Sequence, residues 1–166
     1  MKQVIKANQL VDMLKLIPHP EGGYYKESYR SQESFFPKGF DGERNYGTAI
    51  YFLLQQGDFS GFHRIKSDEC WHFYAGSTLW IHVIHPDGRL KRIELGSDIA
   101  NGELFQANVP AGCWFASEPA PGTGFALVGC TVAPAFDFND FELAEAAVLS
   151  RQFPQHGSLI GRLCRG

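Results

Sequence analysis

The sequence predicts an all-β fold, a single antiparallel barrel or sandwich with a short helix at each end. The 166-residue chain is rich in strand-forming aromatic residues, with 14 Phe, 6 Tyr and 3 Trp, and its 18 Gly favour tight turns. Between residues 46 and 134, short strand-like runs alternate with turn residues such as Pro86-Asp87-Gly88. Evenly spaced short strands indicate an antiparallel barrel or sandwich rather than alternating strands and helices.

A short helix is expected near the start of the chain. Asn8 is a suitable N-cap residue, and apolar residues recur after it at helical spacing (Leu10, Val11, Leu14 and Ile17). Pro18 prevents the helix from continuing. The alternating run at 24–31 then predicts a strand, and residues 33–45 carry the Pro and Gly residues that are typical of a loop.

The core of the fold is placed at about residues 46–134. The candidate strands are 46–54, 61–66, 69–76, 78–86, 90–95, 105–110, 113–118 and 124–134. A second helix is expected at 142–153, because Asn139 and Glu142 have capping-box spacing and Pro154 ends the run. No repeat or linker divides the chain, so residues 1–166 are expected to form one domain.

Composition and charge exclude several classes of function. The net charge is −3 without a long basic run, so neither nucleic acid nor an anionic membrane is an expected partner. No apolar stretch approaches the roughly 20 residues of a membrane-spanning helix, and the N-terminal residues are too polar for a signal peptide. The 4 Cys residues are far apart in sequence, which predicts thiols. A cytoplasmic protein is therefore expected.

One stretch has the spacing of a known motif. Gly57-x5-His63-x-Ile65-x3-Glu69-x6-Gly76 resembles the first motif of the cupins, Gly-x5-His-x-His-x3-4-Glu-x6-Gly. Residues 109–115 (VPAGCWF) resemble the Pro-x-Gly-x2-His core of the second cupin motif. The resemblance implies a cupin jelly-roll barrel, in agreement with the strand pattern.

Longer phrases resemble a narrower group within the cupin superfamily. They are HPEGGYYKESYRS (19–31), SGFHRIKSDECWHFYAG (60–76), VPAGCWFA (109–116) and LVGCTVAPAFDFNDFELA (127–144). Together they are similar to the DUF985 (Cupin_5) proteins over almost the full length, from Leu16 to about Ala144. That group has the cupin fold and no settled activity, so the resemblance implies an architecture and leaves the function open.

The motif departs from the pattern of metal-binding cupins, which hold their ion with His, His and Glu of the first motif and His of the second. Ile65 and Phe115 occupy two of these four positions, and neither side chain offers a lone pair. Because only His63 and Glu69 remain, no cofactor is expected. If a divalent metal ion is present, His63 and Glu69 are its expected ligands.

The run GYYKESYR at 23–30 is similar to a run in the dTDP-4-dehydrorhamnose 3,5-epimerases, which are metal-free cupins. Those enzymes use a His at the start of the first motif as base, and their N-terminal aromatic and Glu residues hold the nucleotide. The resemblance implies Tyr25 and Glu27 as ligand contacts, and Glu21 beside the Gly-Gly turn joins them because a carboxylate accepts hydrogen bonds from a base or a sugar hydroxyl. The chain departs at Gly22, where the family has Arg, and it shows no clear match for the family's catalytic Tyr.

The candidate catalytic pair is His63 as base and Glu69 as its orienting partner. Removing a proton from a carbon next to a carbonyl needs a base with a pKa near neutral, and an imidazole beside a carboxylate has one. Arg64, Trp71, His72 and Phe115 complete the candidate ligand-binding set. Each has a structural interpretation as well, since in regular strands Arg64 and His72 point away from the barrel while Trp71 and Phe115 fill it.

The leading hypothesis is a small-molecule-binding cupin, with a sugar or nucleotide-like ligand and a metal-independent isomerase or epimerase activity. The first alternative is a metal-dependent cupin enzyme, a dioxygenase or isomerase. The second is a non-catalytic binding or sensing module. A homodimer is expected, because cupins commonly form dimers and the aromatic N-terminal strand can extend a partner's sheet.

Overall fold

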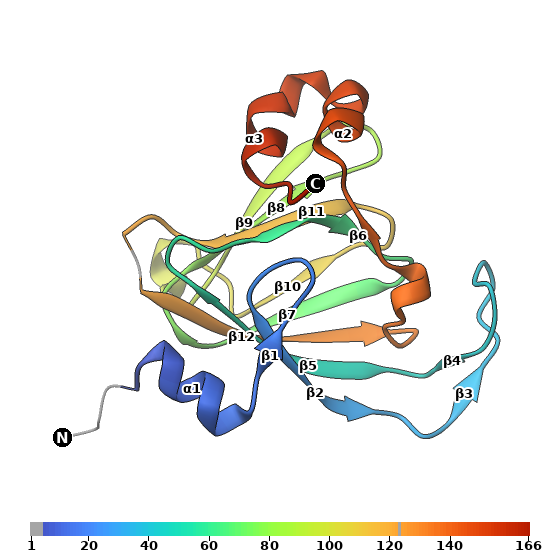
Figure 1. The fold of residues 1–166 in the computed structure, drawn as a ribbon, viewed down its shortest axis with the longest axis horizontal. Helices are drawn as coiled ribbons and strands as arrows, with labels where there is room; N and C mark the ends of the chain where they lie inside the picture. The colour runs from blue at the N-terminus through green and yellow to red at the C-terminus, as the bar shows by residue number, and fades with distance from the viewer. Residues whose placement is uncertain (1–4, 123) are drawn as a thin grey trace.

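Two antiparallel sheets face each other and enclose the core of the computed structural model, which describes residues 5–122 and 124–166 (Figure 1). The larger sheet has the order β1 (Ile17–Pro18), β2 (Tyr24–Arg30), β5 (Thr48–Gln55), β12 (Phe125–Ala133), β7 (Asp68–Gly76) and β10 (Gln106–Val109). The smaller sheet has the order β13 (Glu142–Leu143), β6 (Ser60–Arg64), β11 (Trp114–Pro119), β8 (Leu79–Ile84) and β9 (Leu90–Leu95). The predicted all-β jelly roll is confirmed.

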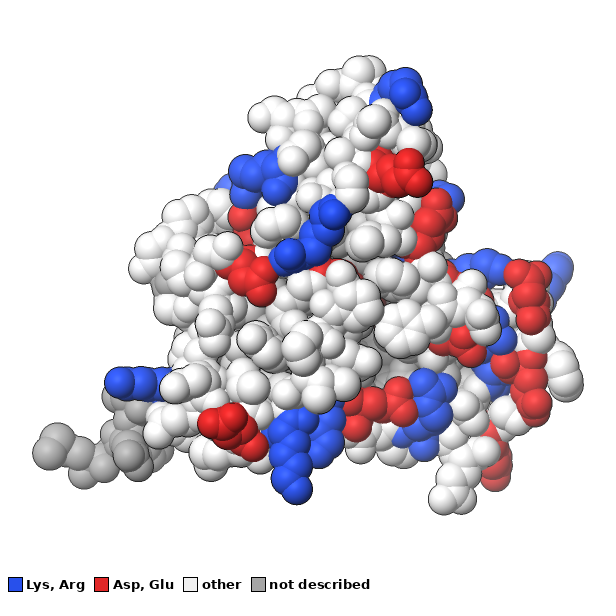
Figure 2. Space-filling model, in the orientation of Figure 1, with Lys and Arg blue, Asp and Glu red and all other residues white. Residues whose placement is uncertain are grey.

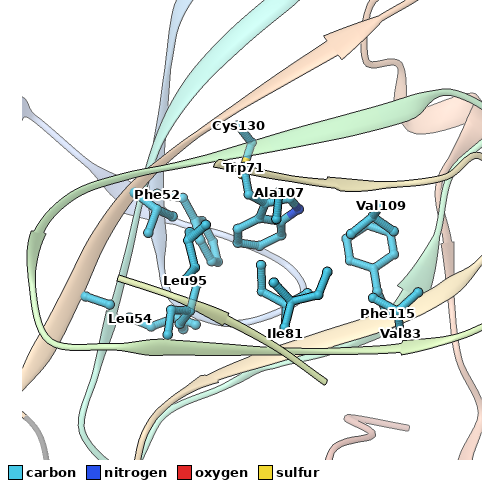
Figure 3. Close-up of a cluster of buried hydrophobic side chains, with 14 of the residues drawn as sticks. Phe52, Leu54, Trp71, Ile81, Val83, Leu95, Ala107, Val109, Phe115 and Cys130 are labelled. Carbon is cyan, nitrogen blue, oxygen red and sulfur yellow. The ribbon is translucent and has the colours of Figure 1, made fainter. Parts of the chain in front are cut away.

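Strand alternation explains the core between the sheets. Every second residue of the larger sheet points inward, so Phe52 and Leu54 of β5 lie with Trp71 of β7. From the smaller sheet, Ile81 of β8 and Phe115 of β11 meet them (Figure 3). Burying a large apolar side chain contributes roughly 1.5–3 kcal/mol, so this layer holds the two sheets together.

Helices cover the outer faces of the two sheets (Figure 1). The helix α1 (Ala7–Leu14) lies on the larger sheet through a cluster that includes Leu53 and Leu127. Near the C-terminus, α2 (Ala146–Gln152), the short 3-10 helix η3 (Pro154–His156) and α3 (Gly157–Arg162) cover the smaller sheet. Leu149 of α2 and Ile160 of α3 are buried there against Phe62 of β6. None of the described helices has the length and apolar character needed to cross a membrane.

The N-terminal helix begins and ends earlier than predicted. Its N-cap is Lys6 rather than Asn8, and the Lys6 backbone N–H donates to the Gln9 side chain. The helix stops at Leu14 because Lys15 adopts a left-handed conformation with φ 55°. The predicted helical position Ile17 therefore lies in β1, opposite Tyr25. The expected loop at 33–45 contains the short strands β3 (Ser34–Phe35) and β4 (Arg44–Asn45).

The predicted capping box at Asn139 and Glu142 is wrong. Glu142 lies in β13, where it pairs with Arg64, and α2 begins later, at Ala146. The residue that acts as a cap here is Asp137, whose side chain accepts the Asn139 N–H at the start of the 3-10 helix η2 (Phe138–Asp140). Pairing with the edge of β6 satisfies the backbone of 142–143, and this tertiary contact outweighs the local helix signal.

The remaining features are the cysteines, one further 3-10 helix and the border of the larger sheet. The 4 Cys residues are free thiols, as expected. A further 3-10 helix, η1 (Ile99–Asn101), lies in the connection between β9 and β10. On its outer side, β2 pairs with the two residues of β1, over Tyr24–Tyr25. The homodimer that would use this edge stays a prediction.

Candidate active site

A cavity of about 720 Å³ lies between the N-terminal segment, the larger sheet and the residues that follow β12. Its lining contains the buried side chains of Glu21, His63 and Glu69, together with those of His19 and Cys130. Buried ionisable groups are rare unless they are paired, and they gather at functional sites. The cavity is therefore the candidate active site.

His63 is fixed on both sides of its ring. It lies on β6, and its Nδ1 is 2.7 Å from the carbonyl oxygen of Gly61. Because a carbonyl only accepts, Nδ1 carries a proton. The other nitrogen, Nε2, is 3.0 Å from Oε2 of Glu21. Burial lowers the pKa of His63, but the charge of Glu21 and its hydrogen bond outweigh burial and raise this pKa. In its charged form, which the Glu21 carboxylate favours, His63 donates one ring proton to Gly61 and the other to Glu21.

Glu21 is the carboxylate of this pair, and a tight turn brings it to His63. Gly22 and Gly23 have φ values of 110° and 75°, which favour glycine. The backbone N–H of Gly61 donates to the Glu21 carbonyl at 2.7 Å, so the turn is tied to β6. Burial raises the pKa of Glu21, but the charge of His63 and its hydrogen bond outweigh burial and lower it. Glu21 is therefore ionised beside a charged His63.

Glu69 is the third ionisable group. It lies on β7 between Val132 of β12 and Val109 of β10, and its side chain points inward. Burial raises the pKa of Glu69 to about 7, while the His63 charge and the Cys130 thiol, which hydrogen-bonds its side chain, act in the opposite direction. Glu69 thus exchanges a proton near neutral pH. The sequence prediction made Glu69 the partner of His63, whereas the structure gives that hydrogen bond to Glu21.

An aromatic wall borders the ionisable groups. His19 lies edge-on to Tyr25, with ring centroids 4.5 Å apart, and 6.2 Å from Phe138. The His19 Nδ1 accepts the Glu21 N–H at 3.2 Å, and burial lowers the pKa of His19, so this ring is neutral with its proton on Nε2. His19, Tyr25 and Phe138 all line the cavity. The wall thus offers ring faces together with one N–H group.

An ion pair lies at the rim of the cavity. Glu27 and Arg30 of β2 form two hydrogen bonds of 2.9 Å, and the Arg30 side chain also donates to the Phe136 carbonyl at 3.0 Å. Figure 2 shows acidic and basic side chains next to one another along the edge at which Figure 1 draws β2. Both side chains are more than a third exposed, so the pair is accessible to a ligand that enters the cavity.

Two residues of the predicted ligand-binding set face the outside of the barrel. Arg64 pairs with Glu142 at 2.7 Å and lies over the Trp114 ring at 4.5 Å. His72 is on the outer face of β7, where Nε2 is 2.9 Å from the Thr131 hydroxyl. Strand alternation gives the reason, because Arg64 follows the inward His63 and His72 follows the inward Trp71. For these two residues the structural interpretation holds.

Trp71 and Phe115 belong to the core rather than to the cavity lining that the described residues form. Trp71 is 1% exposed and lies edge-on to Phe52, with ring centroids 6.0 Å apart. Phe115 pairs with His63 across β11 and β6, and their ring centroids are 4.1 Å apart. Phe115 thus supports the His63 ring at the position where metal-binding cupins have their last histidine.

The residues present do not fit a metal ion. Both ring nitrogens of His63 are engaged by Gly61 and Glu21. Ile65 and Phe115 offer no lone pair. Among residues 5–122 and 124–166, no group of three or more His, Cys, Asp and Glu side chains is arranged to hold an ion. The predicted fallback of His63 and Glu69 as metal ligands is therefore not supported by the donor set.

Sequence reasoning placed five of its candidates in the cavity (Glu21, Tyr25, Glu27, His63 and Glu69) and missed others. His19 is not among the predicted site residues, although its place in HPEGG beside Glu21 is a usable signal. Cys130 is predicted only to be a free thiol. Its neighbours Val128 and Val132 are buried, so strand alternation was the signal that it faces inward. Phe136, Asp137 and Phe138 follow the last long strand and carry no local signal of their position.

Comparison with known proteins agrees with this architecture. The family model described as "Cupin superfamily (DUF985)" matches residues 8–144. A crystal structure of a protein from Shewanella oneidensis is 43% identical with a TM-score of 0.90, covering 98% of this chain and 99% of that chain. A hypothetical protein from Leishmania major is 36% identical with a TM-score of 0.90, covering 98% and 100%. An uncharacterised protein from Saccharomyces cerevisiae is 34% identical over 145 residues, 80% of this chain and 72% of that protein.

Proposed function

The chain belongs to the DUF985 family of the cupin superfamily, and from its cavity we propose that it binds a sugar or nucleotide-like small molecule and catalyses a metal-independent isomerisation or epimerisation. One observation carries the proposal. Glu69, a buried carboxyl with a pKa of about 7, lies in a cavity whose other carboxylate, Glu21, is held ionised by the His63 imidazolium. Two acids with separated pKa values in one cavity are typical of acid–base catalysis.

The proposal assigns the proton transfer to Glu69 and an electrostatic role to His63. In its ionised form Glu69 accepts a proton from a carbon next to a carbonyl, and in its protonated form it returns one. His63 donates both ring protons to Gly61 and Glu21, which leaves it no lone pair with which to act as the predicted base. Its positive charge lies close enough to Glu69 to lower that residue's pKa, and it stabilises negative charge that develops on the substrate.

The ligand class follows from the walls of the cavity. A volume of about 720 Å³ is within the usual range for small-molecule sites, roughly 300–1,000 Å³. The rings of His19, Tyr25 and Phe138 offer contacts to a flat base or to the apolar face of a sugar. The Glu27–Arg30 pair at the rim supplies both acceptors and donors for hydroxyl groups.

The test joins binding with proton exchange. Nucleotides, nucleotide sugars and free sugars are screened by thermal shift, and each compound that binds is incubated with the protein in D₂O. We expect NMR to show deuterium entering the carbon next to the carbonyl. Glu69→Gln is expected to slow this exchange by at least 100-fold while binding persists.

Glu142→Gln is the matched control, because Glu142 pairs with Arg64 outside the cavity. It is expected to keep the exchange rate of the unmodified protein. Full exchange in Glu69→Gln would overturn the assignment of the proton transfer. Binding without exchange for every compound would instead identify a non-catalytic binding or sensing module, the alternative that shares this cavity.

A further inference from the structure

Arg165, near the C-terminal end of the chain, reaches back to the turn that carries Glu21. Its Nε donates to the Glu21 carbonyl at 2.8 Å, and its Nη2 donates to the Phe59 carbonyl at 2.6 Å. The same guanidinium pairs with Oδ1 of Asp58 at 2.5 Å and lies 4.3 Å from the centroid of the Phe59 ring. The Arg165 side chain thus links the Glu21 carbonyl to the Phe59 carbonyl and to the Asp58 carboxylate.

Asp58 extends this connection to the other half of the turn. While its Oδ1 accepts from Arg165, its Oδ2 accepts the backbone N–H of Gly23 at 3.1 Å. The Glu21 carbonyl accepts from Gly61 as well as from Arg165. Glu21 is therefore held through its own carbonyl, and Gly23 is held through Asp58.

The packing around the turn leaves no room for a side chain at Gly22. A Cβ on Gly22 would lie 2.1 Å from the Phe59 carbonyl oxygen and 2.3 Å from Nη2 of Arg165. On Gly61, a Cβ would lie 3.1 Å from Cγ of Arg165. The Arg165 side chain therefore fills the space between the Glu21 turn and the start of β6, and its loss would open that space.

We propose that Arg165 is a positioning residue that holds the Glu21 carboxylate at hydrogen-bond distance from His63. Arg165 lies outside the cavity lining that the described residues form, so it acts through the Glu21 backbone. Without it, the Glu21 turn keeps the Gly61 hydrogen bond but loses the guanidinium that ties its carbonyl to Asp58 and Phe59. The inference concerns the geometry of the His63–Glu21 pair, and only its consequence for turnover rests on the proposed function.

The experiment measures the pKa of the His63 imidazole by NMR titration in Arg165→Ala, Arg165→Lys and the unmodified protein. We expect Arg165→Ala to lower the pKa of His63 by about one unit or more, a tenfold weaker proton affinity. Arg165→Lys is expected to restore part of the difference, because an ammonium still pairs with Asp58 but lacks the fork that also reaches the carbonyls. A purely structural contribution would lower the melting temperature and leave the titration of His63 unchanged.

Arg162→Ala is the matched control. Arg162 lies on the neighbouring α3 and pairs with Glu118, away from the cavity. It is expected to leave the pKa of His63 unaltered. If Arg165→Ala does not fold, Asp58→Asn, which weakens the same connection, is titrated in its place. An unchanged His63 pKa in the folded variant would overturn the inference, and because no substrate is used, this result is independent of the reaction.

Discussion

His63 and Glu21 form a buried ion pair, with Nε2 and Oε2 separated by 3.0 Å and side chains 3% and 8% exposed. Removing two charges from water requires several kcal/mol per ion, so such a pair is weak evidence of a contribution to stability. It is better understood by what it does to its surroundings. The His63 charge lowers the pKa of Glu21 and acts in the same direction on Glu69.

Glu21→Gln is expected to lower the pKa of His63, because it removes the charge and the hydrogen bond that most strongly oppose burial and leaves only the Glu69 charge and the Gly61 carbonyl to oppose it. The raised pKa of His63 stabilises the fold below pH 6.5, and this contribution is lost as the pH rises through the folded-state pKa. The lowered pKa of Glu21 stabilises the fold above pH 4.5, and this contribution is lost as the pH falls. The pair therefore contributes most between pH 4.5 and 6.5.

Urea unfolding at pH 5.5 is the corresponding stability measurement, and a loss of about 3 kcal/mol is expected for Glu21→Gln. Glu27→Gln serves as the control, because Glu27 pairs with Arg30 where both side chains are more than a third exposed. For such a pair a loss below about 1 kcal/mol is expected. Equal losses of unfolding free energy in the two variants would contradict the prediction that the buried pair contributes more to stability than the exposed pair.

Glu69→Gln is expected to stabilise the protein at alkaline pH. The folded-state pKa of about 7 lies above the ordinary value of 4.5 for a glutamate, so ionisation of Glu69 opposes folding and stability falls as the pH rises from 4.5 to 7. A shift of this size corresponds to about 3 kcal/mol. Glutamine resembles the protonated form, so the variant should gain up to that amount at pH 8 and nothing at pH 4. A stability difference that does not change with pH would contradict the assignment.

Gly22→Ala is expected to destabilise the fold by more than about 2 kcal/mol, because backbone strain adds to a clash with the Phe59 carbonyl. Gly39→Ala provides the matched control. Gly39 also has a positive φ, 88°, but a Cβ there would meet nothing within 4 Å. Only backbone strain of roughly 1–2 kcal/mol is expected in that variant. Thermal or urea unfolding of both variants separates the clash from the strain.

Chelation with EDTA is expected to leave the melting temperature and the metal content unchanged. The donor atoms of His63 are engaged within the protein, and the described residues supply no set of three ligands. Elemental analysis before and after treatment checks this prediction. A stoichiometric transition metal whose removal lowers the melting temperature would contradict this prediction.

Sequence patterns predicted side-chain positions best where these depend on local strand geometry or on the spacing of a motif. Strand alternation correctly predicted that Trp71 faces inward and His72 outward, because the side chains of a strand alternate between its two faces. The motif spacing located His63. Glu142 was misassigned to a helix because its pairing with Arg64 is a tertiary contact that no local pattern contains.

The partner of His63 was missed for a similar reason. Glu69 lies close in sequence and shares the motif, whereas Glu21 reaches His63 only because the Gly22-Gly23 turn bends toward β6. Arg165 is further still from the site in sequence, and its contacts with Glu21 and Asp58 exist only in the folded chain. Residues that position other residues across the fold have no signature in composition or periodicity.

The strand order places β1 and β2 at one border of the larger sheet, while β5, β12 and β7 lie within it. The cavity lining therefore has two parts, one on the border of the larger sheet and one on the strands of the barrel. Tyr25 and Glu27 line the cavity from this border segment, whereas His63 and Glu69 line it from the barrel proper. Under the proposed function, substitutions at the border would change which ligand is accepted and leave the residues assigned to proton transfer in place. A chimaera that exchanges residues 17–30 between two relatives should therefore exchange their ligand preference without altering the reaction type.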